Sequence, residues 1–105
     1  MSTIIRDAAP SDITRLIALS RRTIRASHSA FLGGETVDAY IASGAVDRCV
    51  EESIGRCVVI LRGEEIVGYA VWREELIDLM MIDHAVHRQG LGTILLRQVE
   101  AALFR

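Results

Sequence analysis

The sequence contains neither lysine nor asparagine, and all twelve of its basic residues are arginine. The absence of lysine excludes Schiff-base catalysis through a lysine, and it also excludes the phosphate-binding loop that ends in Gly-Lys-Ser/Thr. The absence of asparagine excludes N-glycosylation sites. Fourteen acidic residues give a net charge of −2, so the composition provides no basic surface for nucleic acid or an anionic membrane.

Cysteines and long apolar runs are also scarce. Cys49 and Cys57 are eight residues apart and form no C-x-x-C pair, so we expect two free, mostly buried thiols. His28, His84 and His87 do not have the spacing of a metal site, and we expect no metal. No apolar run reaches the ~18 residues of a membrane span, and the N-terminus does not resemble a secretory leader. These features predict a cytoplasmic protein.

The length and composition predict one domain. The chain has 105 residues, of which 50% are hydrophobic and 25% are charged, which suits one soluble globular domain over residues 1–105 and is too short for two. A domain of this size buries somewhat under ~70% of its unfolded surface, which leaves little reserve of stability. Additional stabilisation by a partner chain is therefore compatible with the length and composition.

The first half of the chain predicts a strand and then helices. Thr3–Arg6 is a β-prone run, and Pro10-Ser11-Asp12 predicts a helix start at which the Ser11 hydroxyl caps free backbone N–H groups and Asp12 favours the positive helix end. Apolar residues then follow at helical spacing as far as Ile24. The arginines between them predict a solvated face, with contact to nucleic acid or an acidic ligand as the lesser alternative: Arg15, Arg21, Arg22 and Arg25. Gly33-Gly34 breaks this helix, and two shorter helices follow over 36–42 and 45–54.

The second half predicts a hairpin, a third strand and a final helix. The hairpin strands are 57–61 and 66–72, joined by Arg62-Gly63-Glu64-Glu65. Residues 76–82 form an apolar run that predicts a strand buried on both faces. Helical spacing then runs from Leu91 to Leu103. The fold class is α/β (α+β), in the order β-α-α-β-β-β-α, with a mixed, mainly antiparallel sheet.

The segment His87-Arg88-Gln89-Gly90-Leu91-Gly92-Thr93 carries the strongest chemical signal. Gly90 and Gly92 let a ligand approach the backbone at the start of a helix, where free N–H groups and the helix dipole favour an anion such as a pyrophosphate. Arg88 and the Thr93 hydroxyl could add contacts to phosphate oxygens. For an isolated Gly-x-Gly, a tight strand-to-helix turn without a ligand would be the preferred interpretation.

The surroundings of this segment change that preference. Residues 77–96 resemble motif A of the GNAT (Gcn5-related N-acetyltransferase) family, which is a buried strand, a short connection, Arg/Gln-x-x-Gly-x-Gly/Ala and a helix. Residues 5–13, followed by Leu16, resemble the opening strand and first helix of that family. Ile66-Val67-Gly68-Tyr69 resembles part of its second and third strands. The resemblance runs from about Ile4 to the C-terminus, in the right order.

The resemblance implies a site for acetyl-CoA. In the family, backbone amides of the glycine-containing loop bind the pyrophosphate, and the fourth strand pairs with the pantetheine arm. By position, the loop is residues 87–93 and the strand contacts are Met81 and Ile82. His87 stands where Arg or Gln is usual, so its charge depends on pH, and His84 stands where Pro is common.

The resemblance also implies that part of the usual fold is missing here. Family members continue through a fifth strand, a fourth helix and further strands, which supply the other wall of a V-shaped cleft and much of the acceptor pocket. We therefore expect either a truncated chain or a second chain that supplies these parts. A homodimer could complete the cleft or cover the open edge of the fourth strand.

Acetyl transfer to an amine needs a base, a polarised carbonyl and an acid for the leaving thiolate. Asp78 and Glu75 are the carboxylates that the resemblance places near the acceptor side, and either could accept the ammonium proton. A backbone N–H near Met81 or Ile82 would polarise the carbonyl. Tyr40 and Tyr69 are candidate acids, but we assign neither, and packing is the preferred role for Tyr69.

Three hypotheses follow from these features. The first is an acyl-CoA N-acyltransferase that moves acetyl from acetyl-CoA to a primary amine by direct attack. The second is a non-catalytic acyl-CoA-binding or dimeric assembly module derived from a truncated acetyltransferase. The third is a structural fragment whose turn binds nothing. Nothing in the sequence identifies the amine.

Overall fold

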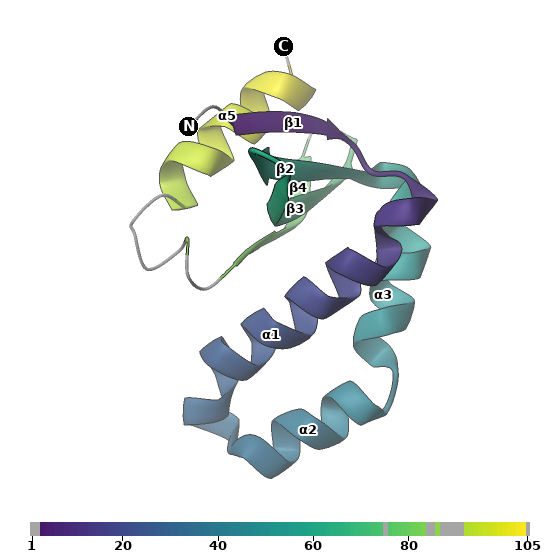
Figure 1. The fold of residues 1–105 in the computed structure, drawn as a ribbon, viewed down its shortest axis with the longest axis vertical. Coiled ribbons are helices and arrows are strands. Elements are labelled where there is room, and N and C mark those ends of the chain that lie inside the picture. Colours follow the sequence, from purple (N-terminus) through teal and green to yellow (C-terminus); the bar gives the residue numbers. More distant parts are fainter. Residues whose placement is uncertain (1–2, 75, 84–85, 87–91, 105) are drawn as a thin grey trace.

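The computed structural model describes residues 3–74, 76–83, 86 and 92–104, and of residues 27–32 it describes the backbone. Figure 1 shows a sheet with α5 on one face and α1 and α3 on the other, while α2 lies at the end of the molecule away from the sheet. In chain order the elements are β1 (Thr3–Asp7), η1 (Pro10–Asp12), α1 (Ile13–Leu32), α2 (Gly34–Ala42), α3 (Ala45–Ser53), η2 (Ile54–Arg56), β2 (Cys57–Arg62), β3 (Glu65–Arg73), β4 (Leu76–Ile82) and α5 (Gly92–Leu103).

The strands form one sheet in the order β1-β2-β3-β4, and each of the three pairings is antiparallel. The predicted α/β fold is therefore confirmed, and the described part of the sheet is wholly antiparallel. Gly63, with φ of 67°, closes the β2–β3 hairpin in a backbone conformation that favours glycine. The register shifts between Ile60 and Leu61 and again between Val71 and Trp72.

The predicted helix breaks are also confirmed. Gly33 has φ of 83° and Gly44 has φ of 81°, so both stand in left-handed backbone that residues with a Cβ rarely adopt. These two positions separate α1, α2 and α3. In the part of the chain that the structure describes, no helix is both long and apolar enough to cross a membrane.

Two apolar clusters cover the two faces of the sheet, because successive side chains of a strand point to opposite faces. Val59, Tyr69 and Val71 pack with α1 and α3, whereas Ile60 and Ala70 pack with Leu95 and Val99 of α5 and with other apolar side chains. A third cluster joins α2, α3 and α1.

The prediction that residues 76–82 are buried on both faces is wrong. Leu76 and Asp78 are exposed, and the other five side chains of β4 are half-buried. The physical reason is position, since β4 is the last strand of the described sheet and pairs only with β3 among the described strands. An apolar run shows that a strand can be buried, but the degree of burial depends on which elements pack beside it.

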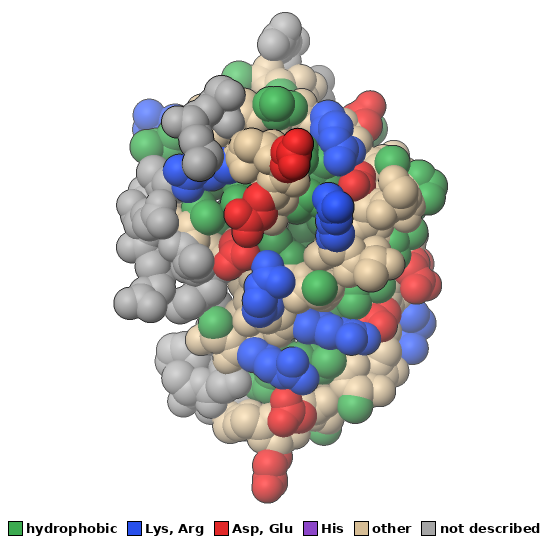
Figure 2. All heavy atoms as spheres, viewed as in Figure 1, with side chains coloured by type: hydrophobic (Ala, Val, Ile, Leu, Met, Phe, Trp, Pro, Cys, Tyr) green, Lys and Arg blue, Asp and Glu red, His purple; other side chains and the backbone are tan. Residues whose placement is uncertain are grey.

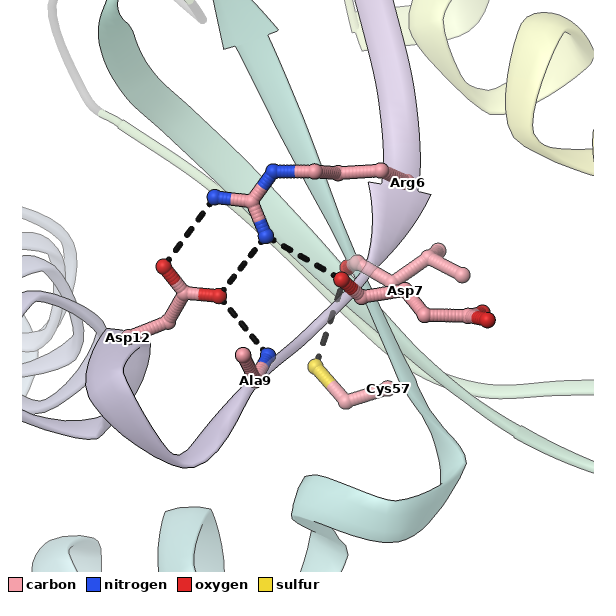
Figure 3. Close-up of polar contacts among 6 residues, drawn as sticks. Arg6, Asp7, Ala9, Asp12 and Cys57 are labelled. Carbon is pink, nitrogen blue, oxygen red and sulfur yellow. Dashed lines mark hydrogen bonds and ion pairs between the residues drawn. The ribbon is translucent and has the colours of Figure 1, made fainter.

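Asp12, not the Ser11 hydroxyl that we predicted as a cap, fixes the start of η1, the turn that leads into α1. Figure 3 shows the Asp12 carboxylate between the Arg6 guanidinium and the backbone of Ala9. The Arg6 N–H groups donate to its two oxygens at 2.8 and 3.1 Å, and the Ala9 N–H donates at 2.8 Å. Asp12 is 5% exposed. Chiefly the hydrogen bonds from Arg6 lower the pKa of this carboxyl, against the opposing effect of burial.

Candidate functional site

The structure describes five of the residues that we predicted for the site: Asp78, Met81, Ile82, Gly92 and Thr93. The first three lie on β4, and Gly92 and Thr93 lie in the first turn of α5. The remaining predicted residues lie outside the described residues: Glu75, His87, Arg88, Gln89, Gly90 and Leu91.

Backbone groups of β4 divide between its partner strand and its other edge. Asp83 N–H, directly after β4, donates to Val67 O of β3 at 2.8 Å. Because alternate residues of an antiparallel strand direct their backbone groups to opposite sides, the backbone of Met81 faces Tyr69 on β3. By the same alternation, the N–H and C=O groups of Met80 and Ile82 point to the edge that no described strand covers.

This alternation refines the predicted role of the strand. We predicted backbone contacts near Met81 or Ile82, and the register separates the two residues. Ile82 presents its backbone to the open edge, whereas Met81 uses its backbone within the sheet. Their side chains also go to opposite faces, with Met81 against the α1 cluster and Ile82 against the α5 cluster.

Gly68 allows β3 and β4 to approach closely at this point. A Cβ added at Gly68 would lie 2.7 Å from Met81 O and 2.8 Å from Cδ1 of Ile82. Gly68 is also the residue paired with Ile82 across the two strands. The position of the end of β4 therefore depends on residue 68 being a glycine, which has no side chain.

The first turn of α5 contains the described part of the predicted anion site. α5 begins at Gly92, and Thr93 is exposed. Leu95 and Val99 are buried and hold this helix against the sheet. The first backbone N–H groups of an α-helix have no partner within the helix. In this chain such groups follow β4 in the sequence, at the start of α5.

Asp83 connects the end of β4 to α1. Its carboxylate accepts a hydrogen bond from the Arg22 guanidinium at 2.8 Å. Its carbonyl accepts from Val86 N–H at 3.0 Å. Sequence reasoning missed this contact, because 61 positions separate Arg22 from Asp83 and no local pattern links them.

The arginines of α1 are mostly engaged with neighbouring elements. Besides the pair at Asp83, Arg21 contacts Asp47 of α3 at 2.6 Å and Arg25 contacts Asp38 of α2 at 3.3 Å. The predicted solvated face is therefore only partly right. The side chains are substantially exposed, yet three of the four arginines form ion pairs that link α1 to α2, α3 and the end of β4.

A cavity of about 610 Å³ lies between α1 and the β2–β3 turn. Its polar lining mixes Arg15, Arg22 and Arg62 with Glu64 and Glu65, above apolar groups that include the buried Leu19. Figure 2 shows that basic and acidic side chains are both present on the face that carries α1. Sequence reasoning did not find this cavity, because its two sides come from α1 and from the β2–β3 turn, which are distant in the chain.

The candidate catalytic side chains have different surroundings. Asp78 is exposed on β4. Tyr69 is 3% exposed, and its hydroxyl lies 2.8 Å from Ser20 Oγ, which itself donates to Leu16 O at 2.8 Å. Since Ser20 has one hydroxyl proton, Tyr69 is the donor in this chain of hydrogen bonds. Burial raises the pKa of Tyr69. The prediction that Tyr69 packs is confirmed, whereas Tyr40 is 52% exposed.

The two cysteines differ in exposure. Cys57 is buried as predicted, but Cys49 is exposed, so the prediction of two mostly buried thiols is wrong for Cys49. The amphipathic helix α3 directs Val46 and Val50 inward and leaves Cys49 outside. Within the described ranges, no group of three or more His, Cys, Asp or Glu side chains could hold a metal ion.

Comparison with known proteins adds a family to this geometry. A family model described as "Acetyltransferase (GNAT) domain" matches residues 16–105. No curated protein sequence gives a significant match.

Three solved structures share the fold. The apo form of YjaB from Escherichia coli has a TM-score of 0.74 and 22% identity, over 97% of this chain and 67% of that one. The PaiA N-acetyltransferase from Thermoplasma acidophilum, in complex with coenzyme A, has a TM-score of 0.75 and 15% identity, over 98% and 72%. A GCN5-related N-acetyltransferase from Rhodopseudomonas palustris has a TM-score of 0.76 and 15% identity, over 98% and 66%.

The present chain thus spans about two thirds of the length of these structures. The family match covers most of the chain, and the three solved structures share its fold. This chain belongs to the GNAT acetyltransferase family.

Proposed function

We propose that this chain binds acetyl-CoA and transfers its acetyl group to a primary amine by direct attack. The observation that carries the proposal is the end of β4, where Ile82 presents backbone groups to an open edge and α5 starts ten positions later in the chain. Family membership and the coenzyme A complex of the PaiA N-acetyltransferase support a CoA-type cosubstrate.

The assigned roles follow the expected chemistry. We assign the pyrophosphate to the first residues of α5 and the preceding segment: His87, Arg88, Gln89, Gly90, Leu91, Gly92 and Thr93. We assign the pantetheine arm to the strand at Met81 and Ile82, with the Ile82 backbone as the contact because it faces the edge.

In the proposed reaction, the amine nitrogen attacks the thioester carbonyl carbon. The C–N bond forms and the C–S bond breaks, so the CoA thiolate leaves and takes up a proton. Asp78 or Glu75 would accept the proton that the ammonium group must lose, directly or through water. The exposure of Asp78 makes it reachable by solvent and by an amine.

An alternative function is a non-catalytic acyl-CoA-binding or dimeric assembly module. The observation that favours it is the burial of Tyr69, whose hydroxyl is engaged with Ser20 and is therefore not available as the acid for a leaving thiolate. In either case we propose one domain over residues 1–105, a cytoplasmic location and a homodimer that completes the cleft or covers the β4 edge.

Calorimetric titration of acetyl-CoA into protein of known oligomeric mass tests the proposal. We expect saturable binding, at one ligand per chain or at one per dimer if two chains share a cleft. An amine screen that detects free thiol then separates the enzyme from the binding module. No binding at millimolar acetyl-CoA would overturn both functions.

Glycine variants test the assigned residues. We expect Gly90→Leu and Gly92→Leu to abolish acetyl-CoA binding, since a side chain would block the approach of a pyrophosphate to the backbone. Gly55→Leu is a suitable control, because a Cβ at Gly55 meets nothing within 4 Å. Unchanged affinity in Gly90→Leu and Gly92→Leu would refute the assignment of this segment.

A further inference from the structure

We propose that Arg22 is a positioning residue, which fixes the end of β4 through its ion pair with Asp83. The link to acyl-CoA affinity rests on the proposed function, because that function assigns the cosubstrate to this end of β4. The structural part of the inference rests on the contacts of Asp83 alone.

Asp83 is held from three directions. Its N–H donates to Val67 O of β3 at 2.8 Å, and its carbonyl accepts from Val86 N–H at 3.0 Å. Its carboxylate accepts from the Arg22 guanidinium at 2.8 Å. Val86 is itself buried in the cluster beneath α5. Asp83 therefore joins β3, the segment after β4 and helix α1 at one point.

The ion pair is poorly explained as a contribution to global stability. The Arg22 side chain is 59% exposed and the Asp83 side chain is 17% exposed. Pairs with such an exposed partner typically contribute little to the free energy of folding. The location of the pair at the end of β4 points instead to a local effect on where that strand ends.

A shift in the end of β4 would affect cosubstrate binding through Ile82. Ile82 directly precedes Asp83, and its backbone faces the open edge of the sheet. Because Gly68 has no side chain, Ile82 already lies close to β3 on one side. Arg22 adds a second restraint from α1, and small displacements of groups that position a ligand have large effects on binding and rate.

Helix α1 offers a matched control. Arg25 is one turn further along the same helix and pairs with Asp38 of α2 at 3.3 Å. Both side chains of that pair are more than half exposed, and the pair joins α1 to α2, which lies away from the sheet (Figure 1). Arg25→Gln and Asp38→Asn therefore remove a comparable charge pair without touching the end of the strand.

The test combines two measurements on Arg22→Gln, Asp83→Asn, their double variant and the two controls. Hydrogen exchange without ligand reports on the amides of Asp83 and Val86. Titration with acetyl-CoA reports the affinity. We expect faster exchange at both amides, and an affinity roughly three- to tenfold weaker, the size that such coupled contacts produce. The double variant should be no weaker than the single ones, and the controls should match the parent protein.

The outcomes separate the two proposals. If exchange is faster in the Arg22 and Asp83 variants but the parent protein binds no acetyl-CoA, the positioning role is supported and the proposed function is overturned. Unchanged exchange would overturn the positioning role, whatever the affinity. Faster exchange with equal losses of affinity in the Arg25 and Asp38 controls would also overturn it, because the effect on affinity would then not be specific to the ion pair at the end of β4.

Discussion

Asp12 shows how one carboxylate can serve two elements. It pairs with Arg6 of β1 through both oxygens and also accepts the Ala9 N–H ahead of α1. A buried carboxylate with these partners favours its charged form. The sequence correctly marked this position as a helix start, but it could not show that Arg6, on the preceding strand, would reach the same side chain.

We expect Asp12→Asn to destabilise the protein by about 2 kcal/mol, because hydrogen bonds to a charged group contribute about 1.5–3 kcal/mol and the amide loses the charge. Chemical denaturation measures the change in the free energy of unfolding. Asp38→Asn is the control, and its exposed pair should change stability by less than about 0.5 kcal/mol. Equal effects of the two substitutions would contradict the role given to Asp12.

The two thiols should differ in reactivity. Cys49 is exposed, whereas Cys57 is buried and burial raises its pKa to about 12. Since the thiolate is the reactive form, we expect one fast equivalent with a thiol reagent at pH 8 and a second only after unfolding. Cys49→Ser should remove the fast equivalent. A fast reaction that persists in this variant would show that Cys57 is accessible.

At the scale of elements, the sequence predicted the strands and helices well. The predicted strand 76–82 coincides with β4, and the glycines at 33 and 44 mark the breaks between helices. These elements were predictable because their signals are local: β-branched runs, helical periodicity and glycine. Burial of β4 was not predictable, since it depends on which strands lie beside it.

The candidate site divides in the same way. Met81, Ile82, Gly92 and Thr93 fall on the predicted elements. The contacts that connect those elements, such as Arg22 with Asp83 and Ser20 with Tyr69, join residues 61 and 49 positions apart. No periodic pattern carries such information, so it appears only when the chain is folded.

The close contact between β3 and β4 predicts a strong effect of a methyl group. In Gly68→Ala, the new Cβ would lie 2.7 Å from Met81 O, so β4 must shift. We expect a loss of about 1–3 kcal/mol in the free energy of unfolding, the usual result of overpacking. Gly55→Ala adds a Cβ in open space and serves as the control. A neutral Gly68→Ala would show that the strands can separate at little cost.

At the scale of the whole molecule, stability should fall at both ends of the pH range. The lowered pKa of Asp12 gives stability that is present above its unfolded pKa, near ~3.9, and is lost as the pH falls through the folded value. The raised pKa of Cys57 gives stability that is present below the ordinary value of 9.0 and is lost as the pH rises to about 12. Tyr69 acts in the same direction as Cys57.

Thermal unfolding across pH measures this dependence. We expect Cys57→Ala to weaken the loss of stability above pH 9 and to leave the acid side unchanged, whereas Asp12→Asn should weaken the loss on the acid side. A Cys57→Ala profile that keeps the full alkaline loss would assign that loss to other groups.

The open edge of β4 can bind only one partner at a time. Along this edge, the outward backbone groups recur every second residue, about 7 Å apart. A pantetheine arm and a strand from a second chain would each pair with those groups, and one edge accommodates one of them at a time. If two chains associate through β4, raising the protein concentration should lower the apparent affinity for acetyl-CoA, whereas association elsewhere should leave it constant.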